Sequence, residues 1–210
     1  MVEVADFAKK IHWLGHDGFR IDASRVIYFD PFQIKAGPKA DIICVSHEHF
    51  DHCSPEDIEK IQTADTVIVT EKDSARKLKG EIKVVKPGDK IEVKGVRIEA
   101  VPAYNIKKDF HPKANGWLGF IVEVDGVRIY HAGDTDFIPE MKQLKVDIAL
   151  LPVSGVYVMT AKEAAEAAKA IKPKIAIPMH YGAIVGSEAD AIEFKNQLSG
   201  IVDVLVLKKE

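Results

Sequence analysis

One hexapeptide, residues 47–52, carries the side chains that are best suited to chemistry. Its sequence, His-Glu-His-Phe-Asp-His, follows an apolar run at residues 42–45 that is typical of a buried strand. Three imidazoles and a carboxylate offer the neutral nitrogen and hard oxygen donors that divalent transition metals bind. Alternate residues of an extended strand end face the same side, so His47, His49 and Asp51 can converge while His52 enters from the turn. A metal site explains this spacing better than a solvated loop that is only rich in histidine.

Two more candidate ligands directly follow predicted strands. Asp134 lies in the sequence His-Ala-Gly-Asp-Thr-Asp after a hairpin, where Gly133 lets the backbone approach a ligand closely. His180 follows the strand predicted at residues 175–179. A single histidine is more often structural, but three groups of polar residues at strand ends favour a shared metal site.

Apolar and alternating runs predict the elements that position these residues. We expect strands at residues 11–14, 19–22, 26–29, 42–45, 66–70, 91–93, 96–101, 120–124, 127–131, 146–151, 175–179 and 202–207. The Asp125-Gly126 pair is a strong signal for a hairpin turn. Helices are predicted from Ser54, at residues 71–79, from a capping box at Thr160 up to Pro173, and at residues 187–198. This order of elements favours two packed sheets with helices outside.

The composition is that of an ordinary globular domain. The 210 residues are 47% hydrophobic and 29% charged, and they suit one large domain or two closely packed halves. A formal charge of −3 argues against holding nucleic acid by phosphate neutralisation. No apolar run approaches the roughly 18 residues of a membrane span. The acidic N-terminus is unlike a secretory signal, and Cys44 and Cys53 suit reduced thiols, so we expect a cytoplasmic protein.

A weak internal repeat suggests two related halves. Residues 25–30, which end in Asp30, precede an apolar run at 40–43, and residues 127–134, which end in Asp134, precede another at 146–149. Each stretch predicts a strand, an acidic loop and a second buried strand. Chance convergence of two similar strand pairs explains the pattern equally well. The domain at residues 1–210 is therefore one unit or two related halves that meet face to face.

The order of these motifs resembles the metallo-β-lactamase superfamily of metal-dependent hydrolases. The His-x-His-x-Asp-His motif, the Gly-Asp-Thr sequence after a hairpin and the strand that ends in histidine span residues 10–182. The sequences at residues 13–19, 30–31 and 178–181 resemble the branch that contains ascorbate-6-phosphate lactonase. The resemblance implies an α+β fold, a four-layer αββα sandwich of two facing mixed sheets with helices outside. It also implies a metal cleft at one edge of the paired sheets.

The resemblance further implies how the ligands divide between one or two divalent metal ions. By position, His47 and His49 bind a first metal; Asp51, His52 and His180 bind a second; and Asp134 bridges the two. Zinc is the expected metal, although histidine and carboxylate ligands also accept manganese, nickel or iron. Asp51 or Asp134 could accept the proton of the attacking water, as could Asp30 behind the ligands.

The chain departs from the family pattern at Asn105. Members of the family normally hold the first metal with a third histidine, on a loop where this chain has Val-Pro-Ala-Tyr-Asn at residues 101–105. An amide oxygen is a weak partner for zinc. His111 lies a few residues further on, and we favour it as the replacement ligand or a substrate contact over a plain surface histidine. If neither residue reaches the site, the protein works with one metal.

Other polar residues near the motifs have supporting roles in this interpretation. His16 lies in a tight turn and is expected in the cleft wall. His12 is expected to be structural, and His131 to be structural or to orient a ligand carboxylate. Tyr157 and Tyr181 could donate to a substrate oxyanion or simply pack.

Together these residues predict a hydrolase. A bound metal lowers the pKa of water from 15.7 towards about 7 and stabilises negative charge on oxygen. The first hypothesis is a small ester-like substrate, with a lactone as the best guess. The second is a phosphodiesterase or nuclease, and the third is a metal-binding or regulatory module with an incomplete first site. Specificity is expected from the loops at residues 105–117 and 155–159, and the sequence leaves a homo-oligomer open.

Overall fold

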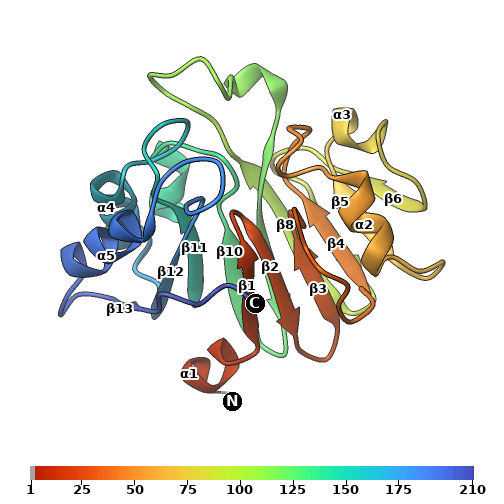
Figure 1. Ribbon diagram of the computed structural model, residues 1–210, viewed down its shortest axis with the longest axis horizontal. Helices are drawn as coiled ribbons and strands as arrows, with labels where there is room; N and C mark the ends of the chain where they lie inside the picture. The colour runs from red at the N-terminus through yellow and green to blue at the C-terminus, as the bar shows by residue number, and fades with distance from the viewer. Residues whose placement is uncertain (1–2) are drawn as a thin grey trace.

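The loops that carry the predicted ligands lie along one edge of two facing sheets. The computed structural model describes residues 3–210, and Figure 1 shows the two sheets between helices on both outer flanks. The fold is therefore the predicted α+β sandwich, with layers in the order helix, sheet, sheet, helix.

The first sheet is mixed and has six strands in sequence order. The strands are β1 (Ile11–Gly15), β2 (Gly18–Asp22), β3 (Val26–Phe29), β4 (Ile42–Val45), β5 (Val67–Thr70) and β6 (Glu81–Val84). The pairs from β1 to β3 are antiparallel, and those from β3 to β6 are parallel. Every residue of β4 and β5 is buried, because the second sheet covers one face and helix α2 (Pro55–Ile61) covers the other.

The second sheet has seven strands in the order β13-β12-β11-β10-β9-β8-β7. The strands are β7 (Lys90–Val93), β8 (Val96–Pro102), β9 (Leu118–Val124), β10 (Val127–His131), β11 (Ile148–Pro152), β12 (Ile175–Met179) and β13 (Asp203–Val204). The pairs from β7 to β10 are antiparallel, and those from β10 to β13 are parallel. Helices α4 (Ala161–Ile171) and α5 (Glu188–Gln197) lie on its outer flank (Figure 1).

The capping residues begin their helices where the sequence predicts. The Ser54 hydroxyl accepts a hydrogen bond from the Asp57 backbone N–H, and Thr160 and Glu163 form the capping box of α4. The other helices are short: α1 (Val4–Ala8), α3 (Lys72–Ala75), η1 (Lys113–Asn115) and η2 (Pro139–Gln143). Across residues 3–210 no helix combines the length and the apolar character that crossing a membrane requires.

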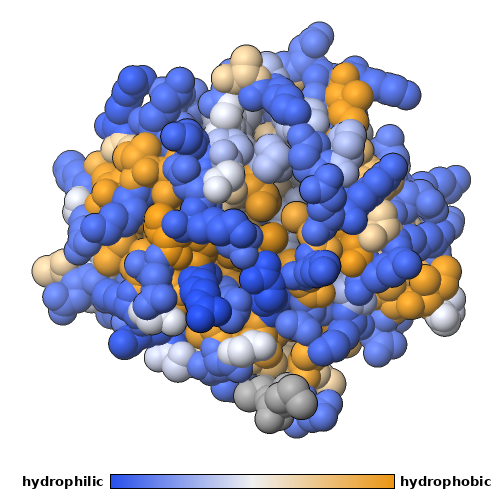
Figure 2. All heavy atoms as spheres, turned by 180° about the vertical axis from the view of Figure 1, so that it is seen from behind, coloured by the Kyte–Doolittle hydropathy of each residue, from blue (hydrophilic) through white to orange (hydrophobic). Residues whose placement is uncertain are grey.

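Two apolar clusters hold the layers together. The larger fills the space between the sheets, where Phe29, Phe120 and Ile129 are fully buried. In the smaller, Ile58 and Ile61 of α2 pack on the outer face of the first sheet. Full burial of such a side chain is worth about 1.5–3 kcal/mol, so the strand ends that leave this core are firmly fixed. Seen from behind, much of the outer surface is hydrophilic (Figure 2).

Parallel pairing brings the predicted ligands to one edge of the sandwich. β3 pairs in parallel with β4, and β10, β11 and β12 form a parallel set, so their following loops leave at the carboxyl ends. Figure 1 shows loops of both sheets gathered at the upper edge. Asp30 follows β3 and Asp134 follows β10, in comparable positions of the two sheets. That the two halves of the chain are related stays a prediction.

The elements differ from the expected ones mainly at the margins. The strand expected at 202–207 pairs only over Asp203–Val204, because it is an edge strand held by two residues of β12. The helix expected at 71–79 is limited to Lys72–Ala75. β6 was not predicted, since three of its four side chains are exposed and its sequence does not alternate as a core strand does. The single turn and a half of α1 was also not predicted.

Candidate metal centre

The structure brings the predicted ligands into two adjoining groups. The first contains His47, His49, His111 and Asp134, whose donor atoms all lie within 4.8 Å of one another. Nε2 of His111 is 3.0 Å from Oδ2 of Asp134, and Nε2 of His47 is 3.9 Å from the same oxygen. Three imidazole nitrogens and one carboxylate oxygen are a donor set that suits zinc.

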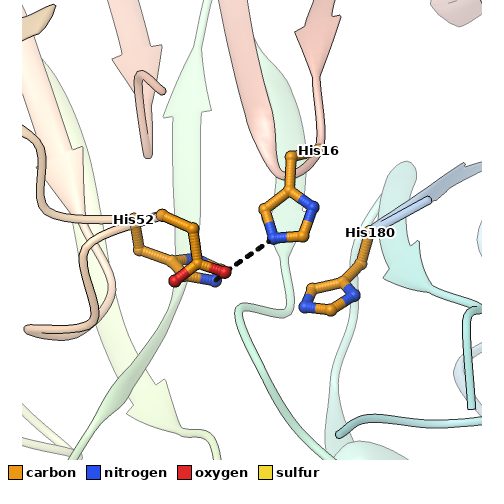
Figure 3. A group of neighbouring side chains, drawn as sticks. His16, His52 and His180 are labelled. Atoms are coloured by element: carbon orange, nitrogen blue, oxygen red, sulfur yellow. Dashed lines mark hydrogen bonds and ion pairs between the residues drawn. The ribbon is translucent and has the colours of Figure 1, made fainter. Parts of the chain in front are cut away.

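The second group contains His16, Asp51, His52 and His180, again with donor atoms within 4.8 Å of one another. Nε2 of His16 is 3.0 Å from Oδ2 of Asp51. Figure 3 shows the rings of His16, His52 and His180 converging from three different segments, with the contact to His16 drawn as a dashed line. The chain thus places three imidazoles and a carboxylate around a second point.

Asp134 lies between the two groups. Its Oδ2 faces His111 and His47, whereas its Oδ1 is 3.4 Å from Nε2 of His52 and 3.3 Å from Nε2 of His180. Each carboxylate oxygen therefore faces a different set of imidazoles. This is the geometry of a carboxylate that can bridge two cations.

Several of these donor atoms have no hydrogen-bond partner among residues 3–210. Nε2 of His52, His111 and His180 and Oδ1 of Asp134 are buried and accept or donate no hydrogen bond. A buried polar atom without a partner costs about 1–3 kcal/mol, and such atoms are rare in folded proteins. Because these orphaned atoms face one another, the residues present fit a bound divalent cation.

Hydrogen bonds behind the imidazoles fix their orientation. Nδ1–H of His52 donates to Oδ2 of Asp30 over 2.8 Å, and Nδ1–H of His180 donates to the Ser154 hydroxyl over 2.8 Å. Nδ1–H of His111 donates to Oδ1 of Asn105 over 3.0 Å. Each bond holds a proton on Nδ1 and leaves Nε2 free to face the centre, as supporting hydrogen bonds do in metal sites.

Asn105 supports His111 rather than replacing it. Its Oδ1 also accepts the His111 backbone N–H, and its Nδ2 donates to Asp136 and to the Tyr157 carbonyl. His111 is only 1% exposed, so the alternative of a plain surface histidine is wrong. His111, six residues after Asn105, thus adds a third imidazole to the first group of candidate ligands.

His16 lies closer to the centre than the expected cleft wall. Its ring contacts Asp51 and it belongs to the second group of candidate ligands. Its backbone is left-handed, with φ of 52°, as are those of Asp30 (38°) and His180 (61°). Residues other than glycine rarely adopt this conformation, which costs about 1–3 kcal/mol. Three residues of this centre are therefore held in strained backbone.

The remaining residues with expected supporting roles pack around the site. Tyr181 is buried and stacks on Trp13 with ring centroids 4.6 Å apart, and burial raises its pKa to about 12. His131 contacts the Asp17 carbonyl through Nε2 and accepts the Gly133 N–H through Nδ1, so it orients the loop before Asp134.

Asp17 is a residue that the sequence did not reveal. It is fully buried, both carboxylate oxygens lack a hydrogen-bond partner, and it groups with His52, Asp134 and His180 within 4.8 Å. Its position in the turn beside His16 was the available signal. Only the folded structure shows that this turn places the Asp17 carboxylate next to the second group of candidate ligands.

Burial and charge set the protonation of the metal-free centre. Burial and the charge of Asp134 raise the pKa of Asp17 well above its usual value, although His180 opposes this. Burial also opposes ionisation of Asp134, but the charges of His180 and His52 outweigh it and hold the pKa of Asp134 well below its usual range. For His180, Asp134 and Asp17 outweigh burial and raise the pKa to about 9. Metal binding must therefore displace protons from this centre.

Replacing Asp17 with asparagine is expected to stabilise the metal-free protein at pH 7. Because the pKa of Asp17 is raised on folding, the folded chain keeps a proton that the unfolded chain releases above about pH 4, and stability falls as pH rises above that value. Asp17→Asn removes this loss, so we expect about 1–3 kcal/mol of added stability at pH 7 that shrinks towards pH 4. Urea unfolding of the metal-free wild type and variant between pH 4 and 8 measures this difference in the free energy of unfolding.

The same variant is expected to bind metal about 10- to 100-fold more weakly, since asparagine cannot ionise when a cation displaces the proton of Asp17. Competition with a chromophoric chelator measures the affinity. Asp65→Asn, in an exposed turn, is the matched control and should change neither the free energy of unfolding nor the metal affinity. Equal stability of Asp17→Asn and wild type across the pH range would contradict the prediction.

Comparison with known proteins agrees with this geometry. A model of the β-lactamase superfamily domain matches residues 10–180. The chain therefore belongs to the β-lactamase superfamily, and it is a metal-dependent hydrolase with the fold of that superfamily. Proteins from Pyrococcus abyssi and Thermoplasma acidophilum, both named UPF0173 metal-dependent hydrolases, are each 38% identical to it; the alignments cover 95% and 96% of this chain and 96% and 95% of theirs.

Solved structures of other hydrolases have a similar fold. A metal-dependent hydrolase from Parabacteroides distasonis is 39% identical, covers 95% of this chain and 93% of its own, and superposes with a TM-score of 0.84. Igni18, a metallo hydrolase from Ignicoccus hospitalis, is 25% identical over 94% of both chains, with a TM-score of 0.77. The narrower resemblance to the ascorbate-6-phosphate lactonase branch stays a prediction.

Proposed function

We propose that this protein hydrolyses a small ester-like molecule, with a lactone as the preferred substrate, at a centre of two divalent metal ions. His47, His49 and His111 would hold the first ion, Asp51, His52 and His180 the second, and Asp134 would bridge them. The observation that carries the proposal is the division of the two Asp134 oxygens between the two groups of imidazoles.

The bound ions would supply Lewis acidity, which lowers the pKa of water from 15.7 towards about 7 and stabilises charge on the substrate oxygen. In the hydrolysis, the water oxygen bonds to the acyl carbon, the acyl–oxygen bond of the ester breaks, and the released alkoxide takes a proton from the water. The products are a carboxylic acid and an alcohol, joined in one molecule when the substrate is a lactone.

Asp51 is the carboxylate best placed to orient the attacking water. Burial raises its pKa, but the hydrogen bond from His16 and the charge of His52 outweigh burial and lower the pKa to about 2, so Asp51 is ionised at neutral pH. It is also only half-buried. Asp30 is fully buried behind His52 and already accepts hydrogen bonds from Ser46 and His52, so it positions a ligand instead.

Zinc is the metal that we propose for the first group, because three imidazoles and one carboxylate form a four-ligand set that zinc accepts readily. Manganese, iron or nickel suits the second position as well, since Asp51 and the bridging Asp134 would give it two carboxylates. The placement of His111 supports a complete first site and therefore a catalytic protein over a regulatory module. A small-molecule substrate, a homo-oligomer and a cytoplasmic location stay predictions.

Metal analysis combined with a substrate panel tests the proposal. We expect about two divalent ions per chain in the purified protein, loss of hydrolysis after chelation, and recovery when zinc or manganese is restored. The panel compares aliphatic lactones with phosphodiesters, and lactones should react faster. A protein that binds no metal at stoichiometric level, or that cleaves only phosphodiesters when loaded, would refute the function proposed here.

A further inference from the structure

Exposed apolar side chains gather on the loops that surround the metal centre. Across residues 3–210 nine large hydrophobic side chains are exposed, and five of them lie on these loops with 42% to 69% of their surface exposed. The five, which we term the apolar rim, are Phe50, Ile106, Phe110, Val156 and Ile184. Figure 2 shows hydrophobic side chains among hydrophilic ones at the upper edge of the molecule. Apolar side chains that are exposed around a candidate site favour a binding role for that site.

The sequence ties the rim to the centre. Phe50 stands between His49 and Asp51, and Phe110 directly precedes His111. Ile106 follows Asn105 on the same loop. Val156 and Ile184 lie on the loops after β11 and β12, which meet where the Ser154 hydroxyl accepts the bond from His180.

Aromatic contacts hold two sides of the rim next to the candidate ligands. The Phe50 ring packs edge-on against Phe32 with centroids 5.8 Å apart, and Phe32 in turn lies 6.1 Å from the His16 ring. On the other side Phe110 packs edge-on against Tyr157 at 4.8 Å. The Tyr157 carbonyl accepts a hydrogen bond from Asn105, which orients His111. Phe50 and Phe110 are thus each connected to a candidate ligand through one or two intervening residues.

The burial of the ligands shows where a substrate must enter. His47, His52, His111, His180 and Asp134 are at most 4% exposed. Only His49 and Asp51 are half-buried, and Phe50, the residue between them in the chain, is 69% exposed. The two accessible ligands thus share a loop with an exposed aromatic ring.

The charges near the rim favour a neutral substrate. Lys108 is paired with Asp136 and also donates to the Val158 carbonyl, and Glu48 is paired with Lys77. Lys108 and Glu48 therefore have partners, and the exposed Lys107 and Asp109 of the same loop carry opposite charges, so this loop offers no excess of positive charge to a phosphate. Apolar surface is instead what the approach to the centre presents.

We infer that the substrate carries an apolar acyl or alkyl chain that the apolar rim binds, with Phe50 and Phe110 as its main contacts. This inference rests on the proposed hydrolase function and narrows its substrate class to lipophilic lactones and esters. Burial of one methylene changes affinity by up to about fourfold. Because the rim is open to solvent, each methylene is only partly buried. A six-carbon chain should therefore raise the affinity about tenfold or more, which is less than fourfold for every carbon.

A series of γ-lactones with no side chain or with two, four or six side-chain carbons tests the inference on the metal-loaded protein. We expect kcat/KM to rise at least about tenfold from the shortest to the longest lactone. Phe50→Ser and Phe110→Ser should each reduce this rise to about threefold or less, with metal content equal to wild type. Ile192→Ser, which removes from α5 a side chain about as exposed as Phe110, is the matched control and should keep the full rise of kcat/KM.

Binding of the carboxylates butyrate and octanoate, measured by calorimetry, gives a second readout that needs no turnover. Octanoate should bind about tenfold more tightly than butyrate, with a negative heat-capacity change that Phe50→Ser diminishes. Hydrolysis that is indifferent to chain length, or equal binding of the two acids, overturns the inference while the hydrolase function stands. Chain-length-dependent binding without any hydrolysis supports the role of the apolar rim in binding an apolar chain and refutes the proposed hydrolase function. A change of oligomeric state in Phe50→Ser would show a subunit interface instead.

Discussion

Replacing Asp134 with alanine is expected to empty both metal positions and to lower hydrolysis by at least about 10³-fold. Removal of one electrostatic partner from a catalytic site alone costs about 10²- to 10³-fold, and Asp134 faces both groups of imidazoles through its two oxygens. Without its charge, four buried imidazoles would also lose the carboxylate that they share. Elemental analysis after dialysis, together with the rate on the best lactone, measures the effect.

Asp134→Asn is the matched variant, since it keeps the shape of the side chain and one oxygen but removes the charge. We expect it to retain at most about one ion per chain, in contrast to none for Asp134→Ala. Circular dichroism of both variants shows whether the fold persists. A full complement of two ions in Asp134→Ala would contradict the bridging position.

Replacing His111 with alanine is expected to remove one of the two ions and to leave the other in place. His111 supplies the third imidazole of the first group, whereas the second group does not use it. Asn105→Ala should act more mildly, with affinity for that ion about 10- to 100-fold weaker, because the amide only orients the His111 ring. Isothermal titration of zinc into the metal-free proteins resolves the two positions.

His12→Ala serves as the control for this pair. His12 is a partly exposed histidine that contacts Asp22, away from the metal centre. The His12→Ala variant should therefore leave zinc binding unchanged. If Asn105→Ala removed an ion as completely as His111→Ala, the amide would be a direct ligand and the assignment of His111 would be wrong.

The sequence predicted those parts of the centre that follow directly from a strand. The hexapeptide at 47–52, Asp134 and His180 all come at the end of apolar runs, and parallel pairing brings such ends to one edge. Local pattern is sufficient there, because the strand fixes both position and direction. The two sheets and the helices α2, α4 and α5 were predictable for the same reason.

Residues on turns and long loops were harder to place, because nothing local decides which way their side chains face. His16 and Asp17 share a turn between two antiparallel strands, and only the packing of that turn against the second sheet brings both to the centre. His111 depends on a loop whose path is set by Asn105 and Asp136, far apart in the sequence. Long-range hydrogen bonds of this kind leave no periodic signal.

The left-handed backbone at His16, Asp30 and His180 has a consequence for how this protein could evolve. At each of these positions glycine would relieve the backbone, yet glycine carries no imidazole or carboxylate. Selection for stability alone would therefore pull all three positions away from the residues that the chemistry needs. Their presence in this chain means that the folded state forgoes part of its stability so that these side chains are in place before a metal or substrate binds.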